Sequence, residues 1–512
     1  MNWELFVLIL YFAAMLGMGI YFFTKSKSTS DKDYFLGGRS MGPWVTAMSA
    51  QASDMSAWLL MGLPGSILAF GLGEAWIGIG LALGTALNWI LVAKRLRRFS
   101  KAANDSITVP QYLSNRFAAK GKGLQVTCAI VFLVCFTIYV ASAFVAGTNV
   151  FESLFPNVER WLAMLIFAVI LITYTFLGGY KAVCWTDFFQ GLLMLVAVLS
   201  VPIIIILTKD INTGMISDVT VSTSNGPVTY TFITNLFDAS AADIASGLAW
   251  GLGYFGMPHI LVRFMSIKKP SMVKKSAIVA ITWVVLALTA VVFIATFGRM
   301  LIGEELLSIG KGNMVFVNLA RDIFPAAIVG ILLSAIIAAS MSTADSQLLV
   351  ASSSFTSDIY KPIIRKNASD KENLWVGRVV VLVIAAIAFA IAMIGGTGAQ
   401  AIMDLVECAW GGFGSAFGPV IILSLFWRRF TYKGALAGVI AGAVTDIVWL
   451  TLFTGTLEGI FGRTHIYDTG IYEIIPGFAV SMIVAIIVTL CDKAPSNEVT
   501  AIFDKATSES DD

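Results

Sequence analysis

Aspartate and hydroxyl side chains interrupt otherwise apolar segments of this 512-residue sequence. Asp54 lies well inside one such segment, and Ser342, Thr343, Asp345 and Ser346 lie inside another. An ionised side chain at the centre of a membrane costs about 2.5–3.5 kcal/mol or more, so Asp54 needs a compensating partner. We expect Asp54 to act close to a bound cation; the alternative is that it caps amides freed by a helix break.

A second group of polar residues shares one helix face. Ser342, Asp345 and Ser346 occupy positions i, i+3 and i+4. Asp187 begins another apolar segment near the same membrane side, so its carboxylate can approach Asp345. Two close carboxylates cannot both stay charged cheaply and would hold a second cation or one shared proton. The alternatives are that Asp187 caps a helix start and that Asp345 pairs with Lys181.

Aromatic residues recur at helical spacing in a glycine-rich stretch. Trp250, Tyr254 and Pro258 are four residues apart, which places them on one helical face. The glycines between them allow the backbone to open, and Tyr139 lies at a comparable depth in another segment. Core packing explains any one of these residues, but their convergence beside a break favours a ligand pocket.

Cysteine and histidine patterns argue against other chemistries. Five cysteines lie in or beside apolar runs at unrelated spacings, which fits neither a disulfide framework nor a zinc site. His259 and His465 have no Cys or His neighbour at ligand spacing, and HExxH does not occur. We therefore expect no enzyme activity and no organic cofactor. The net charge of +2 gives no indication of a nucleic-acid partner.

These residues need helices that span a membrane to position them. The sequence is 57% hydrophobic and 13% charged, about half the charged share near 25% of soluble domains. Apolar runs of about 20 residues recur along it, which predicts a single all-α transmembrane domain over 1–493 in contact with membrane lipid. The first run, Leu5 to Phe23, lacks a basic start and a cleavage site, so we expect it to remain as a spanning helix. The acidic tail, 494–512, is predicted to be cytoplasmic and disordered.

Thirteen apolar segments place the termini on opposite sides of the membrane. Basic residues collect in cytoplasmic loops. With the N-terminus outside and the C-terminus inside, all but six of the 34 Lys and Arg residues fall inside. The six outside are Arg160, Lys209, Arg299, Lys311, Arg321 and Arg463.

Ten central segments divide into two halves of opposite topology, about 40–208 and 240–428. Each half begins with a segment broken by Gly and Pro: Gly62, Pro64 and Gly65 in the first, and Gly251, Gly253, Gly256 and Pro258 in the second. Paired interruptions of this kind indicate an inverted-repeat transporter with a site near the membrane midplane. The alternative is that these glycines only allow close helix packing.

Several long motifs resemble the sodium/solute symporter family over nearly the whole chain. They are Gly37-Gly-Arg-Ser-Met-Gly-Pro43, Ser49-Ala-Gln-Ala-Ser-Asp-Met-Ser56, Gly178-Gly-Tyr-Lys-Ala-Val183, Thr186-Asp-Phe-Phe-Gln190 and Met341-Ser-Thr343. Further strings resemble most closely the members that import proline with sodium: Trp58 to Gly65, Trp250 to His259, and Tyr472-Glu-Ile-Ile-Pro-Gly477.

This resemblance implies a LeuT-type five-plus-five core with one extra N-terminal and two extra C-terminal helices. It implies a primary sodium site whose ligands are carbonyls of Ala52, Met55 and Ala339 and hydroxyls of Ser342 and Thr343. The alternative is that these hydroxyls bond carbonyls of their own helix.

The same resemblance places Ser56 beside the pocket of Tyr139, Trp250, Tyr254 and Pro258. It implies sodium-coupled import of L-proline by alternating access in a bacterial cytoplasmic membrane. Trp and Tyr match the ring of proline and can face its ammonium group, and amides at a half-helix N-terminus can hold its carboxylate. The segment Trp410 to Pro419 is a candidate hinge, or its glycines only permit tight packing. Another small carboxylate or amino acid as the solute, and a membrane sensor, remain alternatives.

Overall fold

The structure is a computed structural model in which α-helices make up nearly all of the regular elements. It describes residues 2–25, 31–177, 179–212, 216–223, 226–396, 398–455 and 465–508. Gly178 and Arg463, both named above, lie outside these ranges.

Ten helical spans in the described residues are long and apolar enough to cross a membrane. Nine follow single helices: α1 (Trp3–Lys25), α8 (Gly123–Leu154), α10 (Tyr180–Thr208), α13 (Val273–Ser308), α15 (Ala326–Ser354) with its π-helical end η9 (Phe355–Ile364), α16 (Asp370–Ile394), α17 (Ala399–Phe426), α18 (Tyr432–Leu452) and α20 (Ile474–Cys491). The tenth joins η3 (Leu72–Glu74), α5 (Ala75–Leu87), the π-helix η4 (Asn88–Ala93) and α6 (Lys94–Ala102). The shorter α9 (Arg160–Leu177) is also strongly apolar.

Two further apolar stretches form broken helices. In the first, α3 (Pro43–Asp54) ends before a single turn, η2 (Ala57–Leu59), and α4 (Gly62–Phe70) follows. In the second, α11 (Ala241–Gly253) and α12 (Pro258–Ser266) flank a short irregular segment. Pro258 has no amide hydrogen, so it begins α12 instead of extending α11.

Glycines of α5 pack closely against the backbone of α11 in the second broken helix. A Cβ on Gly80 of α5 would stand 2.3 Å from the Gly247 carbonyl of α11, and one on Gly84 would stand 2.3 Å from the Gly251 carbonyl. Only glycine permits this backbone approach, so α5 holds α11 against the centre of the molecule.

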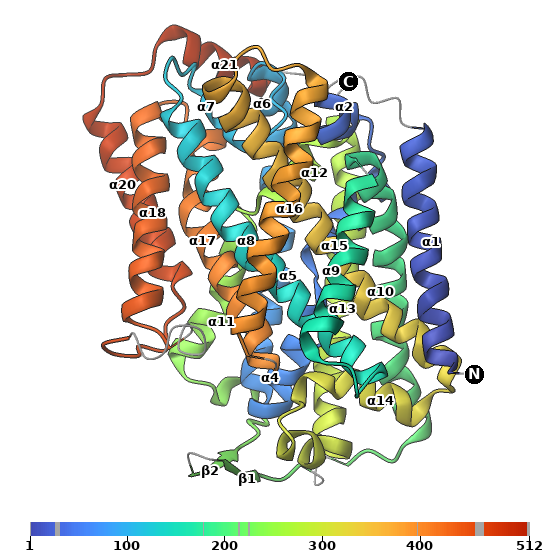
Figure 1. The fold of residues 1–512 in the computed structure, drawn as a ribbon. Helices are drawn as coiled ribbons and strands as arrows, with labels where there is room; N and C mark the ends of the chain where they lie inside the picture. Colours follow the sequence, from blue (N-terminus) through green and yellow to red (C-terminus); the bar gives the residue numbers. More distant parts are fainter. Residues whose placement is uncertain are drawn as a thin grey trace.

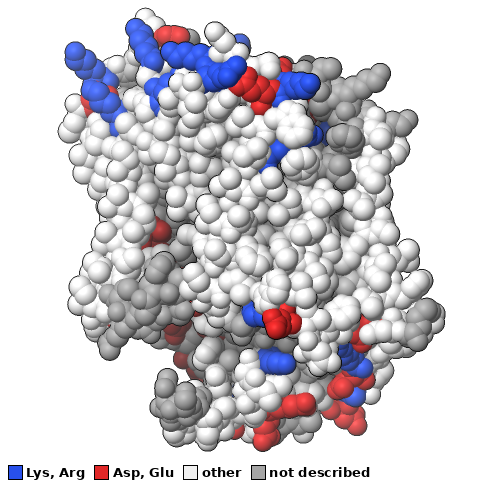
Figure 2. All heavy atoms as spheres, in the orientation of Figure 1, with Lys and Arg blue, Asp and Glu red and all other residues white. Residues whose placement is uncertain are grey.

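The two ends of the bundle differ in their connections and charge. Figure 1 shows the N-terminus at the lower end and the C-terminus at the upper end. Helices α2 (Asp31–Leu36), α7 (Val109–Arg116) and the end of α6 lie at the upper end, where Figure 2 shows Lys and Arg gathered. A broad band in the middle of this face carries few charged side chains.

Short elements cover the lower end. They are the antiparallel hairpin β1 (Val219–Thr223) and β2 (Gly226–Tyr230), the turns η6 (Leu236–Asp238) and η8 (Gly312–Met314), and α14 (Val315–Ile323). Arg299 of α13 supports the hairpin by donating to the Tyr230 carbonyl at 2.8 Å. The remaining short elements are η1 (Gly37–Arg39), which contacts α2, and η7 (Pro270–Met272), which contacts α6.

The chain after residue 494 differs from the predicted disordered tail. Helix α21 (Asn497–Ser508) packs on α6, with Phe503 edge-on to Phe99 at 5.2 Å between ring centroids. Val499, Phe503 and Ala506 recur at i, i+4 and i+7 and are buried, so α21 has an apolar face that its acidic composition conceals. Residues 509–512 lie outside the described part of the chain.

Candidate sodium and substrate sites

The first helix break exposes backbone carbonyls in the middle of the bundle. Helix α3 ends at Asp54, and Met55 leaves the helical conformation with φ −81° and ψ 73°. Ser56 caps the following turn, its hydroxyl accepting from the Trp58 amide at 3.4 Å. The break therefore lies beside Ala52 and Met55, two of the sodium ligands that the resemblance implies.

Hydroxyl groups of α15 reach this break. The Ser342 hydroxyl donates to the Ala52 carbonyl at 2.8 Å, and the Thr343 hydroxyl reaches the same carbonyl at 3.4 Å. The contact of Ser342 with Ala339 in its own helix is longer, at 3.3 Å. The contact between helices is thus the shorter one, contrary to the alternative that these hydroxyls only bond their own helix. Ala52, Met55, Ala339, Ser342 and Thr343 are all buried.

Asp54 points toward the aromatic residues of α11. Its carboxylate accepts a hydrogen bond from the Tyr254 hydroxyl at 2.5 Å, and the residue is only 1% exposed. The amides at the break find other acceptors, since the Met55 amide donates to the Gln51 carbonyl and the Ser56 amide to the Asp54 carbonyl. Asp54 therefore does not cap the break with its side chain. It lies between the carbonyls of α3 and the pocket residue Tyr254.

The predicted pocket residues come together in an enclosed aromatic cluster. Trp250 and Tyr254 flank the second break, where Pro258 begins α12. The Tyr139 hydroxyl faces the side chains of Ser56 and Trp58. The five predicted residues are all buried, so a ligand reaches them only after surrounding helices move.

Three aromatic residues outside the predicted pocket set complete the cluster. Trp410 of α17 lies 5.0 Å from Tyr254, and Tyr472 lies 5.2 Å from Trp250, between ring centroids. Trp58 lies 6.3 Å from Trp250. Trp58 and Tyr472 occur in the resembling strings, but the sequence gives no signal that they approach Trp250.

Asp187 lies in a polar cluster that contains an unpredicted arginine. It sits two turns inside α10, which excludes a cap at the helix start. One carboxylate oxygen accepts from the Ser49 hydroxyl at 2.6 Å and from Arg263 of α12 at 3.1 Å. Arg263 also donates to the Ser346 hydroxyl. The guanidinium thus joins Asp187 to the helix that carries Ser342, Asp345 and Ser346.

Asp345 belongs to the same buried region. It is 0% exposed, and the phenol of Tyr11 on α1 interacts electrostatically with both Asp345 and Asp187. The two carboxylates predicted to approach each other therefore lie around a common neighbour. The sequence did not predict the contact of Arg263 with Asp187, because more than seventy residues separate the two in the chain.

The candidate hinge, Trp410 to Pro419, is part of the uninterrupted helix α17. A Cβ on Gly256 would stand 2.2 Å from the Phe413 carbonyl, and the α-carbon of Gly253 lies close to Gly414. The glycines here permit close packing against α11.

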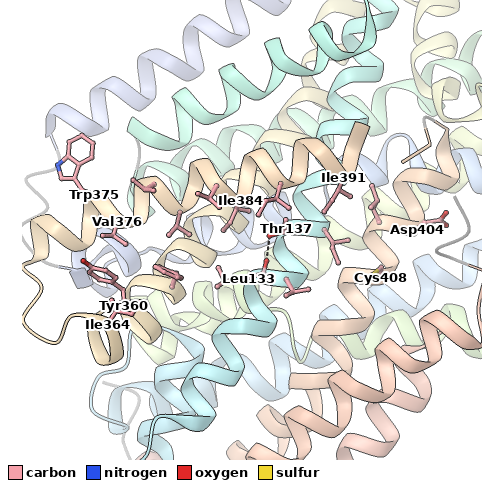
Figure 3. Close-up of a pocket in the computed structure, with 18 residues that line it drawn as sticks. Leu133, Thr137, Tyr360, Ile364, Trp375, Val376, Ile384, Ile391, Asp404 and Cys408 are labelled. Atoms are coloured by element: carbon pink, nitrogen blue, oxygen red, sulfur yellow. Dashed lines mark hydrogen bonds between the residues drawn. The ribbon is translucent and has the colours of Figure 1, made fainter. Parts of the chain in front are cut away.

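A separate apolar groove of 960 Å³ runs along α8, α16 and α17. Figure 3 shows Trp375 and Tyr360 toward one end of it and Asp404 toward the other. None of the predicted sodium or substrate residues lines this groove.

Known proteins resemble the chain over almost its full length. Residues 34–442 match the model of the sodium:solute symporter family. A sodium/proline symporter of Haemophilus influenzae is 42% identical over 506 residues, which cover 98% of this chain and 96% of that protein. A sodium/proline symporter of Escherichia coli is 43% identical over 508 residues with the same coverage. An osmoregulated proline transporter of Bacillus subtilis is 40% identical over 504 residues, 96% of each chain.

Solved structures share the fold at low sequence identity. A substrate-bound, outward-open Na⁺-coupled sialic acid symporter superposes with a TM-score of 0.74 at 19% identity, covering 96% of this chain and 98% of that one. A nucleobase-cation-symport-1 family transporter in a closed conformation gives a TM-score of 0.54 at 13% identity, covering 94% and 99%. The family match over residues 34–442 and the identity of at least 40% to the relatives confirm the resemblance seen in the motifs: the chain belongs to the sodium:solute symporter family.

Proposed function

We propose that this protein imports L-proline together with sodium by alternating access in a bacterial cytoplasmic membrane. The observation that carries the proposal is the match of 98% of the chain to two sodium/proline symporters at 42% and 43% identity. The relatives are transporters, which argues against an enzyme.

The topology that accompanies this function has thirteen crossings. Ten long spans, α9 and the two broken helices account for them, and the termini lie at opposite ends. The basic end with α6, α7 and α21 faces the cytoplasm, because Lys and Arg collect there. The two broken helices then head two inverted five-helix repeats, about 40–208 and 240–428.

Sodium binds at the break of α3 against α15. The carbonyls of Ala52, Met55 and Ala339 and the hydroxyls of Ser342 and Thr343 form a neutral set of oxygen ligands. Support comes from the 2.8 Å contact of Ser342 with the Ala52 carbonyl, which joins the two helices at this depth. Neutral ligands suit an ion that must be released in every cycle, and Asp54 supplies negative charge nearby.

Proline binds beside the sodium ion, among Trp250, Tyr254, Pro258, Tyr139 and Ser56. The rings pack against the apolar part of proline and face its ammonium group. Amides at the half-helix breaks receive its carboxylate. The burial of all five residues supports a mechanism in which the pocket opens to one side at a time.

Asp54 couples the two ligands. Its backbone lies two residues from Ala52, while its carboxylate holds the Tyr254 hydroxyl. A sodium ion that attracts this carboxylate therefore changes the partner of a pocket residue, and proline that displaces Tyr254 changes the charge facing the ion.

Asp187, Ser342, Asp345 and Ser346 surround a second cation or proton position that Arg263 shares. The guanidinium is already bonded to Asp187 and Ser346, so an arriving cation must displace it. The second site is then filled in only part of the cycle.

Uptake by reconstituted vesicles tests the function. A membrane potential of 100 mV supplies about 2.3 kcal/mol per charge. A tenfold sodium gradient adds about 1.4 kcal/mol, and the sum supports roughly 500-fold accumulation at one sodium per proline. A sodium jump should drive labelled proline uptake, whereas full uptake driven by protons alone would contradict the proposal. Stronger inhibition by another small carboxylate or amino acid than by unlabelled proline would reassign the solute, and binding without uptake would indicate a sensor.

A further inference from the structure

Two buried carboxyl groups meet on a glycine face of α17, away from the sodium break. Asp446 of α18 is 3% exposed, and Glu473, immediately before α20, is 0% exposed. A methyl group on Gly411 would stand 3.0 Å from Glu473 Oε1 and 3.1 Å from Asp446 Oδ1. Both carboxyl groups therefore reach the same position on α17.

Glu473 lacks any hydrogen-bond partner in the described part of the chain. Neither of its carboxyl oxygens has one, and its side chain does not cap α20. Asp446 has the Ser415 hydroxyl, which donates to Oδ1 at 2.9 Å. Glu473 lies in the motif Tyr472-Glu-Ile-Ile-Pro-Gly477, to which the transport cycle proposed above assigns no role.

The titratable groups that face this pair are all acidic. Asp404, Glu407 and Cys408 face it from α17, Cys135 from α8, and the Tyr472 phenol precedes α20. No Lys or Arg forms an ion pair with Asp446 or Glu473 among the described residues. Asp404 accepts from the Gln400 amide at 2.6 Å, so its charge has a local donor that Glu473 lacks.

An ionised carboxylate without a partner is costly to bury, and two that face each other repel. A single proton removes both costs. The protonated carboxyl then donates a charge-assisted hydrogen bond to the other, and Ser415 supplies a second donor. A metal ion is the poorer candidate, because groups of three metal-ligating side chains do not occur in the residues that the structure describes.

We propose that Asp446 and Glu473 form a buried proton-binding site in which one proton is shared between the two carboxyl groups. The site lies directly behind the aromatic cluster. Tyr472 packs on Trp250, and Trp410, one residue before Gly411, donates to the Trp250 carbonyl at 2.8 Å. The shared proton therefore lowers the negative charge behind a pocket that we assign to an anionic carboxylate.

Infrared spectroscopy of the full-length protein in lipid vesicles tests this site. A protonated carboxyl has a C=O stretch that a carboxylate lacks, and its frequency shifts in heavy water. We expect this band in the wild type at neutral pH and its loss in both Glu473→Gln and Asp446→Asn. Asp358→Asn is the matched control, because Asp358 is also buried but accepts hydrogen bonds from Thr108, Gln125 and Ser354. This control should keep the band.

Two results would overturn the proposal. One is a band that persists unchanged in both variants while each elutes as a folded, monodisperse protein. The other is a band that disappears when sodium replaces potassium at constant pH, which would show that the pair binds a metal cation. As a second perturbation, Gly411→Ala places a methyl group close to both carboxyl groups and should shift the band without removing it.

Discussion

Asp54→Asn removes the charge closest to the proposed sodium ion while keeping the shape of the side chain. Asp54 is two residues from Ala52, so we take about 6 Å as the separation between its carboxylate and the ion. At an effective dielectric constant near 20, one unit charge at this distance contributes about 2.8 kcal/mol. A loss of that size weakens apparent sodium affinity roughly 100-fold. We expect the variant to fold, because the amide oxygen of Asn can still accept from Tyr254.

The assay is the sodium dependence of labelled proline uptake in vesicles, together with direct sodium binding to purified protein. The matched control is Asp358→Asn, which removes a buried carboxylate far from the α3 break. The control should retain the wild-type sodium dependence. Near-normal sodium activation in Asp54→Asn would refute the reasoning and show that Asp54 only orients Tyr254.

Three further predictions follow from particular contacts. Trp250→Ala should weaken proline binding at least about tenfold, with little change in sodium activation, because an aromatic wall contact is lost; equal losses in two titrations would indicate misfolding. Asp345→Ser should lower the charge moved per proline in current measurements if Asp345 helps to bind a second cation, and unchanged coupling would remove that site. The hydrogen bond from Arg428 holds the pKa of Asp504 below its usual value. Their pairing therefore stabilises α21 fully at pH values above the usual pKa of Asp, and this stabilisation is lost as the pH falls through the lowered pKa. Limited proteolysis at Lys505 should detect the loss as faster cleavage at low pH.

The second broken helix could be predicted because its cause is local. The first breaks earlier than predicted, at Met55, and Gly62, Pro64 and Gly65 lie in the first turn of α4. Gly and Pro in an apolar run weaken a helix wherever the rest of the chain lies, and Pro258 indeed begins α12. The depth of Asp54 and of Ser342 also follows from counting residues along a helix. These features needed no knowledge of packing.

Contacts between distant segments could not be predicted in this way. Tyr254 follows Asp54 by 200 residues. Its hydroxyl reaches the carboxylate because α11 packs against α5 and α12 packs against α3. Arg263 was missed for the same reason. Helix α21 is a different case. The helical spacing of Val499, Phe503 and Ala506 is visible in the sequence, but the prediction of a disordered tail relied on the acidic composition instead.

The polar contacts between α3 and α15 are weak enough for the sodium gradient to supply the free energy that breaks them. Ser342 and Thr343 bond the Ala52 carbonyl, and hydrogen bonds between membrane helices average about 0.6 and reach about 1.7 kcal/mol. Two such bonds cost about 1–3 kcal/mol to break, whereas one sodium ion entering with the gradient and potential described above releases about 3.7 kcal/mol. The ion pair of Arg263 with Asp187 is stronger, because hydrogen bonds to charged groups contribute about 1.5–3 kcal/mol each. We therefore propose that exchange at Ala52 comes first in the cycle, while the stronger Arg263 cluster still joins α10, α12 and α15.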